Sequence, residues 1–216
     1  MVTDTDRLNE AEQAAVAILG GSRVLTQALA NGEVELPIRY SDETLRACAD
    51  ENREGSADWR LVYLRGHSLR EEQKRVGVSQ EHQPCFCNTN WWVGGLIGRW
   101  LRTVPEKFEP GYYLIEFNGR FGQTTWRRQE EAIRALGPRF QRAHEAMVTE
   151  AALRIFEATG VRLLSWYYHW GRSVDFLSNR VYVGHFNVGG WSVGYGPPTY
   201  DGNDLLRVCL TRTFDR

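Results

Sequence analysis

The stretch that says most about the fold is PRFQRAHEAMVTEAALRIFEATG, residues 138–160. Its apolar residues recur in steps of four and three, which is the period of an amphipathic helix. The final glycine follows the last apolar position, where glycine commonly ends a helix. We therefore predict a long helix over about 138–159 that buries Phe140, Val148 and Ile155 against a sheet.

The sequence that follows this helix predicts consecutive strands. LLRVCLTRTF, residues 205–214, alternates apolar and polar side chains, as a strand with one buried face does. RVYVGHF, residues 180–186, is rich in β-forming residues. Aromatic residues favour a further strand over 161–168, and a short one is expected at 191–193.

The sequence before the long helix predicts mostly helices, with two strands. The predicted helices cover about 8–18, 22–29, 42–49, 69–76, 96–101 and 125–136, and the predicted strands cover 59–65 and 112–117. Ser68 and Glu71 form a capping-box pattern at the start of the fourth helix. The expected fold is α+β, with a helical N-terminal third and a mixed but largely antiparallel sheet packed against the long helix. We expect a single domain over 1–216, with 1–55 as a helical extension packed on it.

Composition excludes some functional classes. The chain of 216 residues is 42% hydrophobic and 25% charged, as ordinary globular proteins are. Its formal net charge of −1 does not indicate nucleic acid as a partner, although it leaves this open. No apolar segment approaches the ~18 residues of a membrane span, and the N-terminus has no apolar leader, so no membrane partner and a cytoplasmic location are expected. Composition gives no oligomeric state.

A possible metal motif occurs at His82, Cys85 and Cys87, which spell H-x2-C-x-C. A structural zinc site needs a fourth ligand, and its cysteines usually occur as C-x2-C. The sequence contains no second closely spaced pair of cysteines or histidines that could supply the missing ligand. We therefore predict no metal and no cofactor.

The same stretch continues as NTNWW, residues 88–92, and this segment is a candidate binding lip. Asn88 and Asn90 point the same way if the chain is extended, and their amides offer both donors and acceptors. Trp91 and Trp92 would supply a planar wall beside them. Alternatively, the amides cap a following helix and a tryptophan packs inward.

A second polar group occurs in WYYHWGRSVD, residues 166–175. There Gly171 is expected to bend the chain after a strand, so that His169, Arg172 and Asp175 lie at the strand end. Histidine transfers protons near neutral pH, and arginine binds anions. A surface pair between Arg172 and Asp175 is the simpler alternative.

The leading functional hypothesis is a binding protein for a small planar or anionic ligand such as a nucleotide or a nucleic-acid base. Strand ends are expected to bring together the residues of its pocket: Asn88, Asn90, Trp91, Trp92, Asn118, Arg120, His169 and Arg172. One alternative is a hydrolase or transferase in which Cys87, His169 and Asp175 act as nucleophile, base and orienting carboxylate. A protein–protein adaptor that uses exposed Trp and Arg side chains is another.

Overall fold

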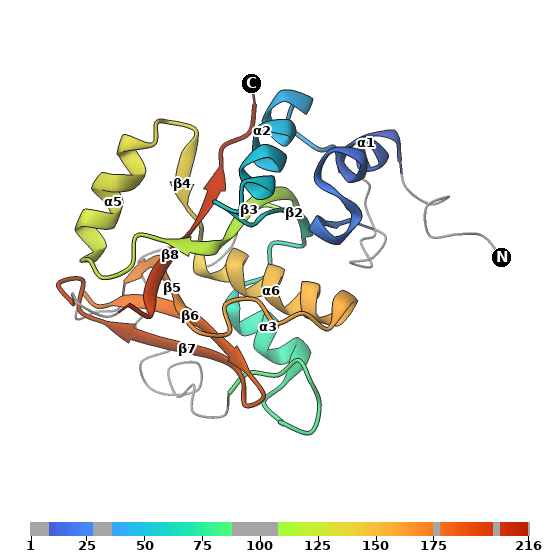
Figure 1. Cartoon of the computed structure of the whole chain (residues 1–216). Coiled ribbons are helices and arrows are strands. Elements are labelled where there is room, and N and C mark those ends of the chain that lie inside the picture. Colours follow the sequence, from blue (N-terminus) through green and yellow to red (C-terminus); the bar gives the residue numbers. More distant parts are fainter. Residues whose placement is uncertain (1–8, 28–35, 88–107, 175–177, 201–203, 216) are drawn as a thin grey trace.

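A mixed β-sheet forms the centre of the protein (Figure 1). The computed structural model describes residues 9–27, 36–87, 108–174, 178–200 and 204–215. The strands are β1 (Val24–Leu25), β2 (Trp59–Leu64), β3 (Gly111–Arg120), β4 (Phe140–Arg142), β5 (Tyr168–Val174), β6 (Arg180–Asn187), β7 (Gly190–Gly196) and β8 (Leu206–Arg212). Their order is β1-β2-β3-β8-β5-β6-β7, with β4 also paired to β8. Only β1–β2 and β5–β8 are parallel among the described pairs, so the predicted α+β fold with a largely antiparallel sheet is confirmed.

Helices pack on both faces of the sheet (Figure 1). They are α1 (Glu10–Leu19), the short 3-10 helix η2 (Gly21–Arg23), α2 (Asp42–Arg53), α3 (Leu69–Val76), α5 (Trp126–Ala135) and α6 (Glu145–Thr159). α3 and α6 contribute to one hydrophobic cluster, and α1, α2 and α5 contribute to the other. β3 supplies alternate residues to the two clusters, because neighbouring side chains of a strand point to opposite faces.

The predicted long helix is confirmed in its main part and wrong at its start. Val148 and Ile155 are buried in α6, as expected. Phe140, however, lies in the strand β4 and pairs with Arg212 of β8. The backbone hydrogen bonds of this pairing override the helical spacing of the sequence. The spacing of a short apolar run does not by itself distinguish a helix from a strand. His144, which falls inside the predicted helix, is instead the N-cap of α6.

Four other local expectations are corrected. The predicted helix over 22–29 is a 3-10 turn followed by β1, which enters the sheet. The strand expected over 161–168 begins only at its last residue, after a turn in which Leu164 has a positive φ of 53°. β3 continues through Asn118, past the predicted strand end at 117, with a bulge that Gly119 accommodates at φ 67°. β5 likewise continues through Gly171 with an irregular register instead of ending there.

The remaining predicted elements are confirmed wherever the structure describes them. The Ser68–Glu71 capping box is present at α3. The strand expected at 191–193 is the longer β7. The helix expected at 96–101 lies outside the described residues. None of the described helices is long and apolar enough to cross a membrane.

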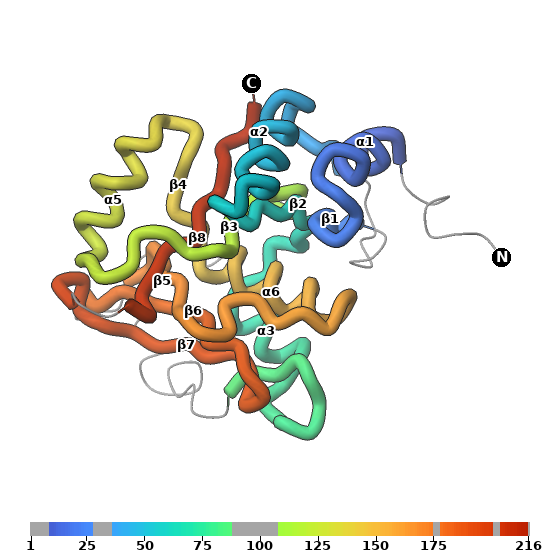
Figure 2. Tube along the Cα trace, in the orientation of Figure 1, coloured from blue at the N-terminus to red at the C-terminus, as the bar shows by residue number. Residues whose placement is uncertain are grey.

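The C-terminal tail runs from β8 past the start of α2 (Figure 2). The carboxylate of Asp215 accepts hydrogen bonds from the Ser41 backbone at 2.7 Å and from the Thr44 hydroxyl at 3.2 Å. The backbone N–H of Asp215 also donates to the carbonyl of Arg39 at 3.1 Å. These bonds hold Phe214 and Arg39 side by side at one end of the sheet.

Candidate functional site

A cavity of about 650 Å³ lies between strands β3, β4 and β8 and the first turn of α6. It is lined by Phe108, Tyr113, Gln141, Arg142, His144, Met147, Arg172, Thr211, Arg212, Thr213 and Phe214. Cavities of roughly 300–1,000 Å³ with apolar walls and a few polar groups are typical of small-molecule sites. The size and the mixture of aromatic, hydroxyl and basic groups make this cavity the candidate binding site.

One wall of the cavity is aromatic. The rings of Phe108 and Tyr113 meet edge to face at 5.6 Å, and those of Tyr113 and Phe214 lie 5.5 Å apart. The Tyr113 hydroxyl donates to the carbonyl of Glu109 at 2.6 Å, so its polar end already has a partner. Met147 of α6 adds an apolar surface. This wall can pack against a planar or apolar part of a ligand.

Two arginines, one in the cavity lining and one stacked on a lining residue, have no hydrogen-bonding or ionic side-chain partner among the described residues. Arg172 lines the cavity and is exposed, and its guanidinium makes no hydrogen bond or ion pair with the described residues. Arg39 is exposed, and its guanidinium lies 3.5 Å from the ring centroid of Phe214. Within the described chain, Arg39 also has no hydrogen-bonding or ionic side-chain partner. Arginine stacked on an aromatic ring keeps its donors free for an anion.

The two other arginines of the lining have structural partners. Arg142 is buried, and its guanidinium donates to Glu130 at 2.7 Å, to Gln129 at 2.9 Å and to the Trp170 carbonyl at 2.6 Å. Burial lowers the pKa of Arg142 to about 10, although Glu130 opposes this shift. Arg212 pairs with Glu51 at 2.9 Å. These two side chains bind the fold together and are not free to bind a ligand.

The start of α6 holds Arg172 in place. The buried carboxylate of Glu145 accepts hydrogen bonds from the Arg172 backbone at 2.9 Å and from the Ser173 hydroxyl. Burial alone would raise the pKa of Glu145, but the neighbouring His144 and these hydrogen bonds lower it, so the carboxylate is charged. A Cβ atom at Gly171 would lie 2.4 Å from this carboxylate, which explains the glycine there. The backbone at position 172 is therefore fixed, while its side chain has no polar partner in the described part of the chain.

The predicted pocket residues are not brought together around this cavity. Arg172 lines it, whereas Asn118 is exposed on β3 and Arg120 pairs with Glu51 at 2.9 Å. Neither Asn118 nor Arg120 belongs to its lining. The other predicted ligand-binding residues in the loop, Asn88, Asn90, Trp91 and Trp92, lie outside the described residues. Their role in binding stays a prediction.

His169 lies in the core and has no nitrogen left for chemistry. Its Nε2–H donates to the carbonyl of Ala143 at 2.9 Å, and its Nδ1 accepts from the backbone N–H of Cys209 at 3.0 Å. Burial and the charge of Arg142 lower the pKa of His169 to about 3, so the ring is neutral. This geometry does not support His169 as the base of a cysteine-dependent enzyme.

The two other residues of that alternative give it no further support. Cys87 is half-buried, and its backbone N–H donates to the Trp191 carbonyl at 2.8 Å. Asp175 lies outside the described residues.

The cavity residues that the sequence did not reveal come from segments far apart in the chain. Tyr113 lies in β3, His144 caps α6 and Phe214 follows β8. Arg39, which precedes α2, is not part of the lining but stacks on Phe214. None of them stands in a motif, and each has an ordinary local explanation. Only the folding of these segments against one another identifies them.

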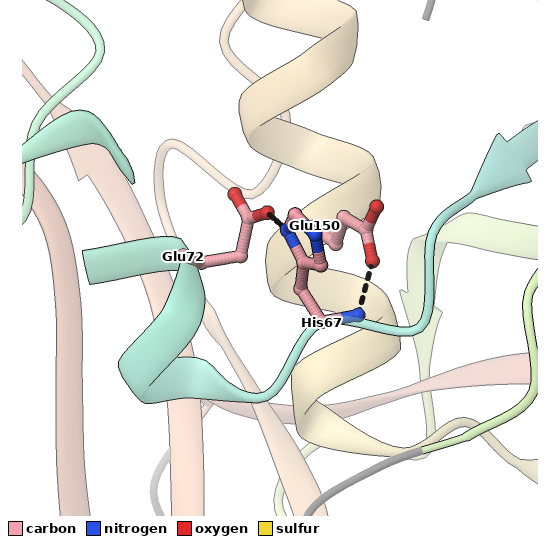
Figure 3. A group of neighbouring side chains, drawn as sticks. All are labelled: His67, Glu72 and Glu150. Atoms are coloured by element: carbon pink, nitrogen blue, oxygen red, sulfur yellow. Dashed lines mark hydrogen bonds and ion pairs between the residues drawn. The ribbon is translucent and has the colours of Figure 1, made fainter. Parts of the chain in front are cut away.

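A second cluster of charged side chains lies where β2, α3 and α6 meet (Figure 3). The Nδ1 atom of His67 lies 2.7 Å from Oε1 of Glu72, a carboxylate with no exposed surface. Glu150 of α6 is also buried, and its two oxygens accept from the backbone N–H groups of Arg65 at 2.7 Å and His67 at 2.9 Å. The cluster fixes both the backbone and the ring of His67.

Arginines already neutralise the two carboxylates of this cluster. Arg75 donates to Glu72 at 2.7 Å, and Arg154 donates to Glu150 at 2.8 Å. Burial would raise the pKa of Glu72, but the bonds from His67 and Arg75 lower it overall. His67, Glu72 and Glu150 are close enough together to hold a metal ion. Two guanidinium groups on the same carboxylates would repel one, so we interpret the cluster as an ion-pair network.

The H-x2-C-x-C motif does not form a comparable cluster among the described residues. His82 is exposed, whereas Cys85 is fully buried and accepts a hydrogen bond from the Gln83 amide at 3.2 Å. Burial raises the pKa of the Cys85 thiol, which disfavours the thiolate that binds metals. The prediction of no metal remains one for elemental analysis.

Comparisons of this chain with protein-family models, with curated proteins and with solved structures found no match.

Proposed function

We propose that the protein binds a small planar anion in the cavity at the first turn of α6. The observation that carries the proposal is Arg172, whose exposed guanidinium reaches the cavity wall while its own backbone is held by buried Glu145. An arginine without a partner in the described chain offers bidentate hydrogen bonds to a carboxylate or phosphate.

The rest of the cavity suits the planar ring of such a ligand. Phe108, Tyr113 and Phe214 provide rings for packing, and the hydroxyls of Thr211 and Thr213 offer polar contacts. The cavity also lies at the N-terminal end of α6, where the helix dipole favours negative charge. Aromatic carboxylates, aryl phosphates and mononucleotides share this combination of ring and anion.

Thermal unfolding with a defined set of probes tests the proposal. Phenyl phosphate, benzoate and a mononucleotide combine ring and anion, inorganic phosphate has only the charge, and benzyl alcohol has only the ring. A ligand at a hundredfold excess over its Kd stabilises the folded state by about 2.7 kcal/mol. For a chain of this length that corresponds to a rise in Tm of roughly 5–10 °C. We expect this rise in Tm with at least one ring-bearing anion, and a smaller rise with inorganic phosphate or with benzyl alcohol.

Arg172→Ala should abolish the rise in Tm without lowering the Tm of the free protein, because the side chain is exposed. Arg128→Ala is the matched control, since Arg128 is an exposed arginine of α5 that does not line the cavity. The proposal fails if no ring-bearing anion raises the Tm of the wild type. It also fails if the Arg172 and Arg128 variants respond alike.

A further inference from the structure

The floor of the cavity is the face of the sheet that packs against α6. Thr211 of β8 pairs with Ile115 of β3 on one side and with Gln141 of β4 on the other. The side chains of directly paired residues point to the same face of a sheet, and Ile115 belongs to the hydrophobic cluster that contains α6. Alternation along the strands places Tyr113 and Thr213 on this face as well. These side chains therefore lie beside one another on three adjacent strands.

The aromatic side chains of the lining lie on the β3 side of this floor. Tyr113 belongs to β3, and the ring centroids of Phe108 and Phe214 lie 5.6 Å and 5.5 Å from its own. Gln141 lies on β4, two strands away from β3. Because neighbouring strands are about 4.8 Å apart, roughly 10 Å separates β3 from β4. The cavity therefore has an aromatic end that does not extend to β4.

Arg172 lies at the opposite end of the cavity, on the far side of β4 from β3. The guanidinium of Arg142, the last residue of β4, donates to the carbonyl of Trp170 at 2.6 Å, so β5 passes the end of β4. Arg172 follows in β5 two residues later and lines the cavity. Burial lowers the pKa of Arg142, and the positive charges of Arg180 and Arg172 add to this effect. The cation of Arg172 is thus close to the β4 end of the floor.

Hydrogen-bonding side chains lie between the aromatic end and the cationic end. Gln141 is exposed, and its amide both donates and accepts. The Thr211 hydroxyl donates to the carbonyl of Leu114 at 2.9 Å, so it offers the cavity a lone pair. Thr213 adds a second, half-buried hydroxyl. A ligand with hydroxyl groups at this place satisfies these donors and acceptors, whereas an apolar segment would displace their water and leave them without partners.

We propose that the ligand of this cavity carries a hydroxylated spacer between its ring and its anionic group, as a nucleoside 5′-monophosphate does, and that Gln141 and Thr213 are specificity-determining residues for the spacer. The inference rests on the proposed function, because Arg172 binds the anion in both. The base packs against Tyr113 and Phe214, and the sugar lies over β8 and β4. In phenyl phosphate and benzoate the anion is attached directly to the ring, so these compounds cannot contact both ends of the cavity as well.

Isothermal titration calorimetry with the full chain tests the inference. The probes are AMP and CMP, their 2′,3′-dideoxy counterparts and phenyl phosphate. Each dideoxy nucleotide has the same base and phosphate as its parent but lacks the two sugar hydroxyls. We expect the Kd of AMP or CMP to be about tenfold lower than that of its dideoxy counterpart, because two neutral hydrogen bonds contribute about this factor. Equal Kd values for both pairs would overturn the inference.

Variants of the two specificity residues locate the effect. Gln141→Ala and Thr213→Val should each reduce the ratio of the two Kd values about threefold, since each removes one partner of the sugar. Gln80→Ala is the matched control, because Gln80 is an exposed glutamine that does not line the cavity. Far-UV circular dichroism checks that each variant is folded. A ratio that neither variant changes would overturn the assignment of the spacer to β8 and β4.

This inference and the proposed function fail on different results. Binding of phenyl phosphate together with equal Kd values for the parent and dideoxy nucleotides overturns the hydroxylated spacer and supports the proposed function. Binding of phenyl phosphate without binding of any nucleotide has the same meaning. Arg172→Ala should weaken the binding of the parent and dideoxy nucleotides alike, because it removes the contact to the phosphate that they share. If neither the nucleotides nor phenyl phosphate bind, both proposals fail.

Discussion

His67 and His169 lie in different parts of the protein and differ in how many ring nitrogens the fold uses. His169 of β5 donates from Nε2 to Ala143 and accepts at Nδ1 from Cys209, with no exposed surface. His67, in the loop after β2, bonds the charged carboxylate of Glu72 through Nδ1, and no described residue bonds its Nε2. The first ring is a core side chain that connects two strands, whereas the second is partly exposed and has one ring nitrogen without a partner among the described residues.

The comparison shows that a promising sequence context does not identify a reactive histidine. In the sequence, His169 lies close to Arg172, Ser173 and Asp175, a combination typical of a functional site. In the fold, however, backbone groups of two other segments form hydrogen bonds with both of its ring nitrogens. His67 stands before a helix cap and has no motif around it. What decides reactivity is the hydrogen-bonding capacity left over after folding.

The largest expected effect comes from removing the carboxylate that orients His67. Glu72→Ala removes the buried carboxylate that accepts from Arg75 and lies 3.9 Å from the guanidinium of Arg154, and such a loss costs about 3–5 kcal/mol. Urea unfolding measures it. Glu131→Ala, at an exposed glutamate of α5, should change stability by less than about 0.5 kcal/mol. Similar values for the two variants would contradict the ion-pair network.

Replacing each histidine by alanine compares the two rings directly. His169→Ala leaves a buried N–H and a buried carbonyl without partners and opens a cavity, so we expect a loss of roughly 3–5 kcal/mol. His67→Ala removes one bond to a charged carboxylate that keeps its arginines, so we expect a smaller loss of about 1.5–3 kcal/mol. Denaturant unfolding at neutral pH gives both values, and the reverse order would show that the assignment of the two rings is wrong.

The acid dependence of stability should report His169. Its folded-state pKa is about 3, against 6.5 for an unperturbed histidine, so its contribution is complete above pH 6.5. This contribution to the free energy of unfolding is lost as the pH falls from 6.5 towards 3, because in this range the unfolded chain binds a proton at His169 and the folded protein does not. By about pH 4 the loss is about 3 kcal/mol. The stability advantage of the wild type over His169→Gln should therefore shrink on acidification, and a constant difference would contradict the burial of a neutral ring.

The smallest effect on stability should come from chemical modification. Diethyl pyrocarbonate acylates neutral, accessible imidazoles, so under native conditions it should modify His67 and leave His169 unmodified. Peptide mapping locates the modified residues, with the exposed His82 as a positive control. Modification of His169 at the rate of His82 would show that its environment is open.

The fold is largely predictable from the sequence, because most elements carry signals in their own residues. The capping box at α3, the alternation in β8 and the apolar spacing of α6 each predict the element correctly. The errors occur where a short segment has no preference strong enough to resist its neighbours. The spacing of Phe140 predicts a helix, but β8 offers it backbone partners that a sequence period cannot reveal.

The candidate site is much less predictable than the fold. Arg172 is predicted to bind a ligand and lines the cavity, whereas the partners proposed for it, His169, Asn118 and Arg120, do not line it. The pairing of Arg39 with Phe214 is not predicted, because most of the chain separates the two residues in sequence. In the structure the guanidinium carbon of Arg39 lies 3.5 Å from the ring centroid of Phe214. Their proximity depends on bonds between Asp215 and the start of α2.

The sequence by itself determined the class of fold, the main helices and strands and the near-neutral charge of this protein, since period, capping and composition act locally. Only the tertiary structure decided which polar side chains remain available. Bonds to distant backbone groups occupy both ring nitrogens of His169, whereas a buried carboxylate bonds Nδ1 of His67 and no described residue bonds its Nε2. The physical reason is that a polar group becomes functional or structural according to the partners that folding brings to it, and those partners come from other elements of the chain.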